Sequence, residues 1–417
     1  MAKKKKKNPN FPPNNNRRGN TKRPTNPTNP NKNQGQKAPK FLVNDRVIRD
    51  IEFTGILEMS ANGYGFVRRL DFEFTATDND PFIHPEMIKQ LELRPGSELF
   101  GIFDEDQNGA RKVIDIMEIN GLPPLEWQKK NRFEFQTPIM PVDYLQLGMR
   151  SDDIEMRVLD LIAPVGLGQR GLIVAPPRTG KTVLLQKIAK IIDDYYKEKI
   201  VLGVLLVDER PEEVTDFMRT TKGMVFASSN DKPTKTHIRI TEMTIGYFKR
   251  LAEAGHDVVL LIDSLTRLGR AYNSAQKGGG RTLSGGLDIR ALEIPKKIFG
   301  SARKIENGGS LTIIATCLVE TNSKMDDLIF EEFKGTGNME VVLDRSLAEN
   351  RIYPAINIAA SGTRNEHKFL PDSVDERTMV RNYLLKKSPG ESMTSLLQVL
   401  KRTDSNEELL RQISAYS

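Results

Sequence analysis

The chain has 417 residues, enough for two or three domains. Its single cysteine, Cys317, excludes an intrachain disulfide, and no apolar stretch approaches the roughly 20 residues that a membrane span needs. The lysine-rich start is not followed by an apolar core, which excludes a secretion signal. We therefore expect a soluble cytoplasmic protein with no membrane partner.

The basic character of the chain is concentrated in residues 1–40. They hold 12 of the 62 Lys and Arg residues and no Asp or Glu, which leaves 50 basic and 55 acidic residues for the remainder. Residues 1–45 are rich in Lys, Asn, Pro and Thr and cannot bury enough apolar surface to offset the entropy of ordering. We predict a disordered basic tail, which either scans RNA phosphates or only keeps the protein soluble.

Residues 46–121 alternate apolar and polar positions over short segments such as FTGILEM, GYGFVRR and SELFGIF. Asn-Gly and Arg-Pro-Gly turn signals separate these segments, which predicts a small β-barrel. The MIKQLEL stretch predicts a short helix between strands. Residues 122–150 carry four prolines and little periodicity, so we expect a linker over the next domain, with Trp127 as its anchor.

Residues 151–417 alternate continuous apolar runs with helical stretches. The runs GLIVAP, VLGVLLVDE, DVVLLIDS and LTIIATCL predict strands that are covered on both faces, as in a parallel α/β sheet. Cys317 lies in the last of these runs and is expected to be a buried strand residue.

Residues 175–182 read Ala-Pro-Pro-Arg-Thr-Gly-Lys-Thr between an apolar strand and a helical stretch, the context that a phosphate-binding loop requires. Lys181 would neutralise the β- and γ-phosphates, and Thr182 would place its hydroxyl on Mg²⁺. Ala175 replaces the usual first glycine, which is tolerable if its φ is negative. The expected ATP contacts in this segment are Pro177, Arg178, Thr179, Gly180, Lys181, Thr182 and Val183.

Two other apolar runs end in carboxylates that a nucleotide site can use. Asp263 closes DVVLLID and is the candidate for holding the metal together with Thr182. Glu209 follows VLGVLLVD and is the candidate for polarising the attacking water. The alternative for Glu209 is a surface charge that caps the following helix, which Glu212 and Glu213 already supply.

Several long blocks, among them VDERPEEVTDFMR, LIDSLTRLGRAYN, SKMDDLIFEEFKGTGNME and SGTR, are together similar to the Rho family of bacterial transcription terminators. The resemblance covers about residues 45–417. It implies a cold-shock-like OB-fold barrel followed by a RecA-like P-loop ATPase. It also implies a hexameric helicase that uses ATP and Mg²⁺, binds nascent single-stranded RNA and releases it from RNA polymerase, with elongation factors as further partners.

The resemblance also assigns roles to residues around the nucleotide. Lys181, Glu209 and Asp263 keep the roles given above, and Arg210 and Arg267 match arginines that surround the nucleotide. The remaining matches are an arginine finger donated by the neighbouring subunit at Arg364, a further intersubunit arginine at Arg351 and an adenine-stacking aromatic at Tyr353. Taken alone, Arg364 is a solvated turn arginine.

For RNA, alternation along GYGFVRR places Tyr64 and Phe66 outward and Val67 inward. The alternative is that these aromatics are barrel core. With Phe82 they resemble the family's primary RNA site, in which Arg68 and Asp80 match residues that read a cytosine edge.

The resemblance implies C-rich or pyrimidine-rich RNA, but near Gly109 only Arg111 of the family's usual acid–arginine pair is retained, so we expect a weaker preference for pyrimidines. Residues 277–286 and 321–325 resemble the family's loops that contact RNA in the channel of the ring. The alternative is that both segments are flexible surface loops. Their expected contacts are Lys277, Arg281, Thr282, Ser284, Gly285 and, in the second loop, Lys324.

Two other functions are compatible with parts of this pattern. A rotary ATPase subunit shares the core architecture and an intersubunit arginine, but the GYGF segment, the glycine-rich loop and the basic tail argue against it. An RNA-binding regulator with a decayed ATPase is the second. Decay is opposed by the presence of all five expected residues: Lys181, Thr182, Glu209, Asp263 and Arg364.

Overall fold

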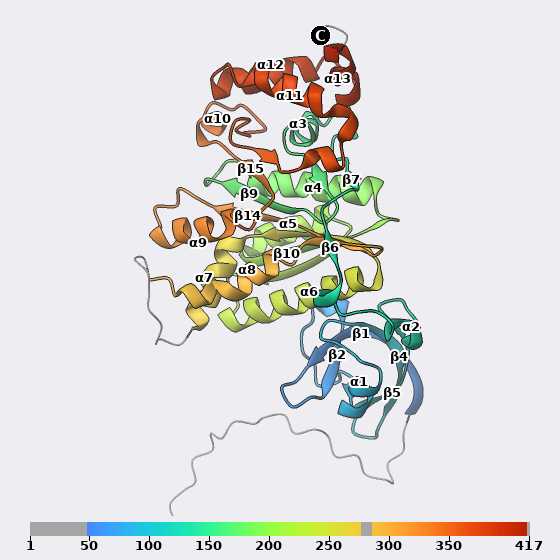
Figure 1. Cartoon of the computed structure of the whole chain (residues 1–417). Helices are drawn as coiled ribbons and strands as arrows, with labels where there is room; N and C mark the ends of the chain where they lie inside the picture. The colour runs from blue at the N-terminus through green and yellow to red at the C-terminus, as the bar shows by residue number, and fades with distance from the viewer. Residues whose placement is uncertain (1–47, 277–285, 415–417) are drawn as a thin grey trace, which may run out of the picture. The chain divides into compact units, whose positions relative to one another are not determined.

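The computed structural model describes residues 48–276 and 286–414 (Figure 1). The predicted basic tail, residues 1–45, lies outside this part of the chain. No helix within the described ranges is long and apolar enough to cross a membrane.

The first part of the described chain is a closed five-stranded barrel with the strand order β1-β2-β3-β5-β4. Along β4 every second residue from Leu99 to Phe103 is buried, as the alternating sequence pattern predicts. Strand β1 pairs with both β2 and β4, which closes the barrel and confirms the predicted OB-type architecture. Its elements are β1 (Ile48–Met59), β2 (Gly65–Arg68), β3 (Phe82–Ile83), α1 (Pro85–Gln90), β4 (Glu98–Glu105) and β5 (Arg111–Ile119).

The segment expected to be a plain linker has structure of its own. Trp127, in the short helix α2 (Pro124–Trp127), is fully buried in the barrel core, and its Nε1 donates to the Glu92 carbonyl at 3.3 Å. The guanidinium of Arg94 lies 4.7 Å from the centre of the same ring. Strand β6 (Pro138–Ile139) then joins the central sheet by pairing with β13 (Arg303–Ile305), because an edge strand can accept another extended segment.

A nine-stranded sheet in the order β11-β10-β12-β14-β9-β15-β16, with β13 and β6 beside β14, organises the rest of the chain. The strands from β11 to β15 in this order pair in parallel, which confirms the predicted α/β sheet. Cys317 is buried in β14. The strands are β9 (Arg170–Ala175), β10 (Ile200–Glu209), β11 (Met224–Ser229), β12 (Asp257–Asp263), β14 (Ser310–Leu318), β15 (Met339–Val342) and β16 (Gly362–Thr363), with a separate pair β7 (Tyr144–Leu145) and β8 (Val165–Gly166).

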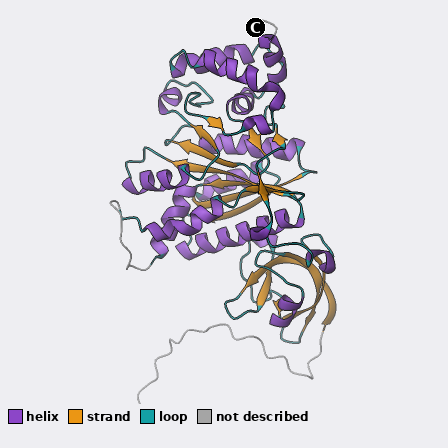
Figure 2. Cartoon of the chain, viewed as in Figure 1, coloured by secondary structure: helices purple, strands orange, loops and turns teal. Residues whose placement is uncertain are grey.

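Helices cover both faces of this sheet (Figure 2). Ile188 of α4 packs in one apolar cluster with Val204 of β10, whereas Phe248 of α6 packs in another cluster with Leu205. Because Val204 and Leu205 are neighbours in one strand, their side chains point to opposite faces. The helices are α3 (Ile154–Ile162), α4 (Lys181–Tyr195), α5 (Pro211–Thr220), α6 (Thr234–Ala254), α7 (Leu265–Ala275), α8 (Glu293–Phe299), α9 (Lys324–Lys334) and α10 (Arg345–Glu349).

The chain ends in a helical layer that sequence patterns did not separate from the ATPase domain. It consists of α11 (Val374–Leu384), α12 (Pro389–Leu400) and α13 (Asn406–Ser414). Arg157 of α3 is fully buried beneath it and donates to the carbonyls of Leu400 and Thr403 at 2.8 and 2.6 Å. These charge-assisted hydrogen bonds satisfy a guanidinium that would be costly to bury alone.

Candidate functional site

The segment that resembles a phosphate loop joins the end of β9 to the start of α4. Gly180 precedes the helix with φ 94°, a left-handed conformation that glycine adopts without steric cost. Arg178 also has a positive φ, 66°, and the Thr179 hydroxyl donates to the Pro176 carbonyl at 2.7 Å. Ala175 is the last residue of β9, whose extended backbone has the negative φ that a methyl group requires.

The ammonium group of Lys181 lies between two buried carboxylates. Its Nζ is 2.6 Å from Asp263 Oδ2 and 3.7 Å from Glu209 Oε2. Asp263 ends β12 and Glu209 ends β10, so parallel pairing brings both carboxylates to one edge of the sheet. The Thr316 hydroxyl of β14 donates to Asp263 Oδ1 at 2.7 Å and fixes the orientation of that carboxylate.

Glu209 has the surroundings of a proton acceptor. It is 2% exposed, its Oε1 accepts from Arg267 Nη2 at 2.9 Å, and within the described residues its Oε2 has no hydrogen-bond donor. Burial raises the pKa of its carboxyl, although the positive charge of Lys181 opposes that rise. A carboxylate with a raised pKa and one oxygen without a donor is suited to take a proton from water.

The two arginines expected near the nucleotide are placed differently. Arg267, in the first turn of α7, donates to the Asp208 carbonyl as well as to Glu209, and so belongs to the cluster. Arg210 is the N-cap residue of α5, and its largely exposed side chain places Nη1 4.0 Å from Glu213. The helix start turns the Arg210 side chain outward, so only its backbone N–H contacts the cluster, by donating to Glu209 Oε1 at 3.4 Å.

A pocket of about 410 Å³ lies beside the loop, and Arg178, Thr179 and Gly180 of the loop contribute to its lining. Tyr353 lines it with a 42% exposed ring, and Val183 and Leu184 supply apolar side chains. Glu155 of α3 lines the same pocket and pairs with Lys187 at 2.9 Å. Sequence reasoning missed Glu155, because it lies in a helix before the loop and carries no motif of its own.

The residues beside Lys181 fit a hard divalent cation. Asp263 offers a carboxylate and Thr182 a hydroxyl, the oxygen ligands that Mg²⁺ prefers, and Mg²⁺ takes its remaining ligands from water and phosphate oxygens. No group of three or more His, Cys, Asp or Glu side chains in metal-binding arrangement occurs within the described ranges. This sparse donor set is compatible with a cation that a nucleotide brings with it.

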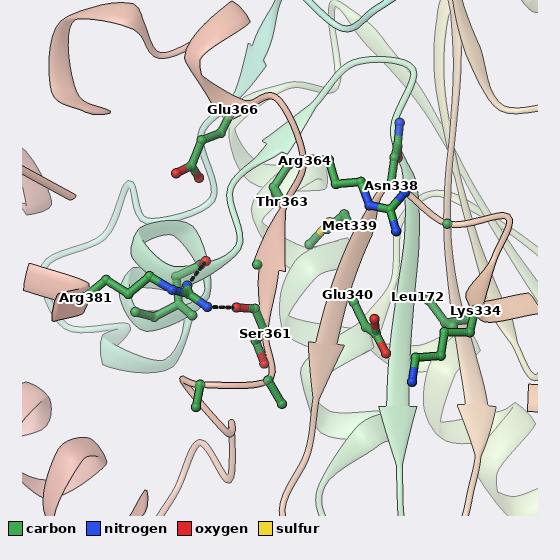
Figure 3. Close-up of a pocket in the computed structure, with 15 residues that line it drawn as sticks. Leu172, Lys334, Asn338, Met339, Glu340, Ser361, Thr363, Arg364, Glu366 and Arg381 are labelled. Atoms are coloured by element: carbon green, nitrogen blue, oxygen red, sulfur yellow. Dashed lines mark hydrogen bonds between the residues drawn. The ribbon is translucent and has the colours of Figure 1, made fainter. Parts of the chain in front are cut away.

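Arg364 lies in a separate pocket of about 370 Å³ that no phosphate-loop residue lines. Its backbone N–H donates to the Asn338 carbonyl at 2.9 Å, and its side chain approaches the pocket from a different side than Arg381 (Figure 3). Burial raises the pKa of Glu340, a lining residue, while the charges of Lys334 and Arg364 oppose that rise. The fold thus keeps Arg364 outside the cluster around Lys181.

Arg351, the other arginine expected between subunits, is an exposed residue near the pocket that Tyr353 lines. It follows α10 with φ 58°, and its N–H donates to the Ala348 carbonyl at 3.0 Å. It is two residues from Tyr353, but it does not line the pocket that Tyr353 lines.

Three aromatic rings form a cluster on the barrel, one just before β2, one in β2 and one in β3. The centre of the Tyr64 ring is 5.8 Å from that of Phe66 and 5.5 Å from that of Phe82. Tyr64 and Phe66 are partly exposed and Val67 is buried, as the alternation predicts. Phe82 differs from the expectation because only 5% of it is exposed, so it supports the other two rings from beneath.

The two residues expected to read a base edge are paired with each other. Arg68 Nη1 donates to Asp80 Oδ2, and both side chains are buried. Asp80 also accepts from the N–H and the hydroxyl of Thr77 at 2.8 and 2.7 Å. A neighbouring groove of about 660 Å³ is lined by Asp80 and Arg111, and Arg111 Nη1 donates to the Asn79 carbonyl at 3.2 Å.

The channel-loop residues are only partly described. Lys277, Arg281, Thr282, Ser284 and Gly285 lie outside the described residues.

Lys324 is exposed at the first position of α9, and the segment before it is a capped helix start rather than a free loop. Asp326 is buried there, accepts from the Thr321 hydroxyl at 2.6 Å and pairs with Arg270.

Two family models match the chain. Residues 53–125 match the Rho termination factor, RNA-binding domain, and residues 155–363 match the ATP synthase alpha/beta family, nucleotide-binding domain.

Similar whole proteins include two transcription termination factors Rho. That of Borreliella burgdorferi is 46% identical over 370 residues, which cover 88% of this chain and 71% of that protein. That of Aquifex aeolicus is 47% identical over 368 residues, which cover 87% of this chain and 84% of that protein.

Solved structures share the fold at low identity. An ATPase from the type III secretion system of pathogenic bacteria aligns with a TM-score of 0.55 and 22% identity over 67% of this chain and 86% of its own. The ATP synthase subunit NeqB from Nanoarcheaum equitans aligns with a TM-score of 0.54 and 16% identity over 67% of this chain and 79% of its own. At these identities the likeness concerns the fold alone.

Proposed function

This chain belongs to the Rho family of transcription termination factors, and on that premise we propose that it acts as a homohexameric ring that moves along C-rich single-stranded RNA. It is an RNA-binding, ATP-hydrolysing enzyme that terminates transcription. The finer proposals concern its residues, its metal ion, its RNA preference and its partners. The observation that supports them best is the cluster of Lys181, Glu209, Asp263 and Arg267 at the phosphate loop.

The cluster suits phosphoryl transfer to water. Glu209 Oε2, which lacks a donor in the described chain, would accept the proton of the attacking water, and Arg267 would hold the carboxylate in place. Lys181 would exchange part of its contact with Asp263 for the β- and γ-phosphates. Mg²⁺, held by Thr182 and Asp263, would neutralise charge on the phosphate oxygens when it is bound.

The location of Arg364 supports donation between subunits. Its pocket contains no phosphate-loop residue, so its guanidinium serves a nucleotide only if a second copy presents its own loop there. Head-to-tail contacts of this kind close into a ring. Arg351 and Arg210 are both exposed beside the nucleotide site of their own subunit. They would contact the same subunit interface from the side opposite to Arg364.

The barrel would hold RNA on the partly exposed rings of Tyr64 and Phe66, since base–aromatic stacking tolerates any sequence. The paired Arg68 and Asp80 would favour cytosine, and Lys324 would contact phosphates in the ring channel. RNA polymerase and elongation factors are the further proposed partners, and the cytoplasm is the proposed location.

The test is ATP hydrolysis by the full chain with and without poly(C), poly(U) and poly(A). We expect stimulation, strongest with poly(C), and its loss in Lys181→Ala, because that variant removes the ammonium that faces the phosphates. The matched control is Lys190→Ala, which changes a 58% exposed lysine on the same helix. Equal turnover with and without RNA would contradict the translocase.

A further inference from the structure

Glu58 carries a carboxylate that two arginines from different parts of the chain share. Its Oε2 accepts from Arg68 Nε, in the neighbouring barrel strand β2, at 2.5 Å. Its two oxygens also accept from Arg239 of α6, Oε1 from Nε at 2.6 Å and Oε2 from Nη2 at 2.8 Å. This fork-to-fork geometry is the strong, directional form of an arginine–carboxylate pair.

On the barrel side, the contacts of Glu58 extend through Arg68 to the proposed RNA face. Arg68 uses its Nε for Glu58 and its Nη1 for Asp80, and Asp80 lines the groove of the barrel. The same guanidinium lies 5.0 Å from the centre of the Phe66 ring. A base that binds to Arg68 and Asp80, or a phosphate that binds to Arg68, therefore competes with the contact that Arg68 makes to Glu58.

On the other side, the contacts lead toward the nucleotide site through α6. His237 lies one half-turn before Arg239 in this helix, and its Nδ1 is 2.7 Å from the Ser228 hydroxyl. Its Nε2 is 4.0 Å from Asp208, whose carbonyl accepts from Arg267. Arg267 in turn holds Glu209, so the backbone of α6 connects Arg239, the partner of Glu58, to a histidine that lies near the contacts of the carboxylate proposed to polarise water.

Besides its pair with Glu58, Arg239 makes a second contact that leads to the central sheet. Its Nη2 donates to the Phe74 carbonyl at 2.6 Å, and the Phe74 ring is stacked on Phe226 of β11 with 4.8 Å between ring centres. Phe226 is opposite Leu205 of β10, the strand that ends in Glu209. A shift of Arg239 thus acts on β10 and on α6 together.

The docking of the barrel on α6 does not depend on Glu58. Gly96 meets Gly246 of α6 so closely that a Cβ on Gly96 would lie 2.3 Å from the Gly246 carbonyl carbon. Near the end of the same helix, buried Glu253 pairs with Arg94. These contacts do not involve Glu58, so we expect the interface to persist when the charge pair at Glu58 is removed.

We propose that Glu58 and Arg239 form the link through which RNA bound on the barrel increases ATP hydrolysis, with Glu58 positioning Arg68 for RNA and Arg239 passing its displacement to the nucleotide site. When RNA binds, Arg68 moves toward the groove, and Glu58 keeps Arg239 as its only arginine partner. Helix α6 then shifts beside Asp208 and Arg267. The inference rests on the proposed RNA-stimulated function and adds the route of the stimulation.

The decisive variant is Arg239→Gln in the full chain, because Arg239 touches neither the RNA face nor the phosphate loop. ATP turnover is measured with and without saturating poly(C), and RNA affinity by fluorescence anisotropy of a labelled oligo(C). We expect the ratio of stimulated to unstimulated turnover to fall at least about fivefold, the lower range of measured coupling between sites. RNA affinity should change by less than about threefold, because Arg68 keeps both of its carboxylate partners. Arg239→Lys keeps the charge without the fork and should restore part of the ratio.

Tyr247→Phe is the matched control, since it removes the 3.3 Å contact between Tyr247 and Glu98 at the same interface and leaves Glu58 untouched. It should keep the full ratio. If Arg239→Gln and Arg239→Lys both keep the wild-type ratio, or if Tyr247→Phe lowers it equally, the inference is overturned while the proposed function stands. If poly(C) fails to stimulate the unchanged protein, the proposed function itself fails.

Discussion

Replacing Glu209 by glutamine tests the catalytic assignment with little change in packing. Glutamine keeps the shape of the side chain and an oxygen that accepts from Arg267 Nη2, but it cannot take a proton from water. Lys181 keeps its 2.6 Å contact with Asp263, so nucleotide affinity should change little. Loss of a positioned general base lowers kcat by about 10²- to 10⁴-fold, which corresponds to about 3–5 kcal/mol of transition-state stabilisation.

The assay is RNA-saturated ATP turnover with kcat and KM determined separately, together with binding of a fluorescent ATP analogue. The matched control is Glu212→Gln, which changes an exposed carboxylate in the first turn of α5 and should leave kcat unchanged. A fall in kcat of less than about tenfold in Glu209→Gln would refute the reasoning, because it would place the proton acceptor elsewhere.

The same substitution has a pH signature with a defined sign. Because burial raises the pKa of Glu209, its carboxyl becomes protonated at a higher pH than an ordinary glutamate does. The ATP turnover of the wild type should therefore fall as the pH is lowered through this pKa. The pH–rate profile of Glu209→Gln should not show this fall. The raised pKa means that folding disfavours the ionised form of Glu209. This destabilisation of the folded state is present above the folded pKa and absent below the unfolded pKa. Glu209→Gln should therefore unfold at a higher temperature than the wild type near neutral pH.

Two further outcomes follow from the other parts of the site. Arg364→Ala mixed with wild-type subunits should lower ATP turnover more steeply than dilution predicts, because each copy would serve its neighbour; a linear decline in a mixing titration would contradict donation between subunits. Phe66→Ala should weaken oligo(C) binding by roughly 5- to 150-fold through the loss of about 1–3 kcal/mol of base stacking, while ATP-analogue binding stays unchanged. Fluorescence anisotropy measures the RNA affinity, and unchanged affinity would remove Phe66 from the RNA face.

The fold was predictable because its signals are local. Alternation in β4 and continuous apolar runs in β10, β12 and β14 report how many faces of each strand are buried. Lys181, Glu209 and Asp263 were predictable as one cluster for a related reason. Glu209 and Asp263 end strands of a parallel sheet and Lys181 follows the loop after a third, and the topology brings the ends of such strands together whatever their separation in sequence.

What sequence reasoning missed depends on contacts across long separations. Phe82 occupies a two-residue strand, too short for alternation to show which way its ring points, and the rings of Tyr64 and Phe66 lie against it in the fold.

Glu58 is a polar residue in a barrel strand, so sequence reasoning expects it at the surface. Nothing near it in sequence indicates its partner Arg239, which is 181 positions away. Burial raises the pKa of Glu58, but hydrogen bonds from Arg239 and the charge of Arg68 outweigh it, and the pKa is lowered. A carboxylate that stays charged while half-buried must have cations supplied by the fold, and in this chain one cation belongs to the RNA face and the other to the motor. The proposed link between the two domains therefore depends on a residue that neither domain's motif contains.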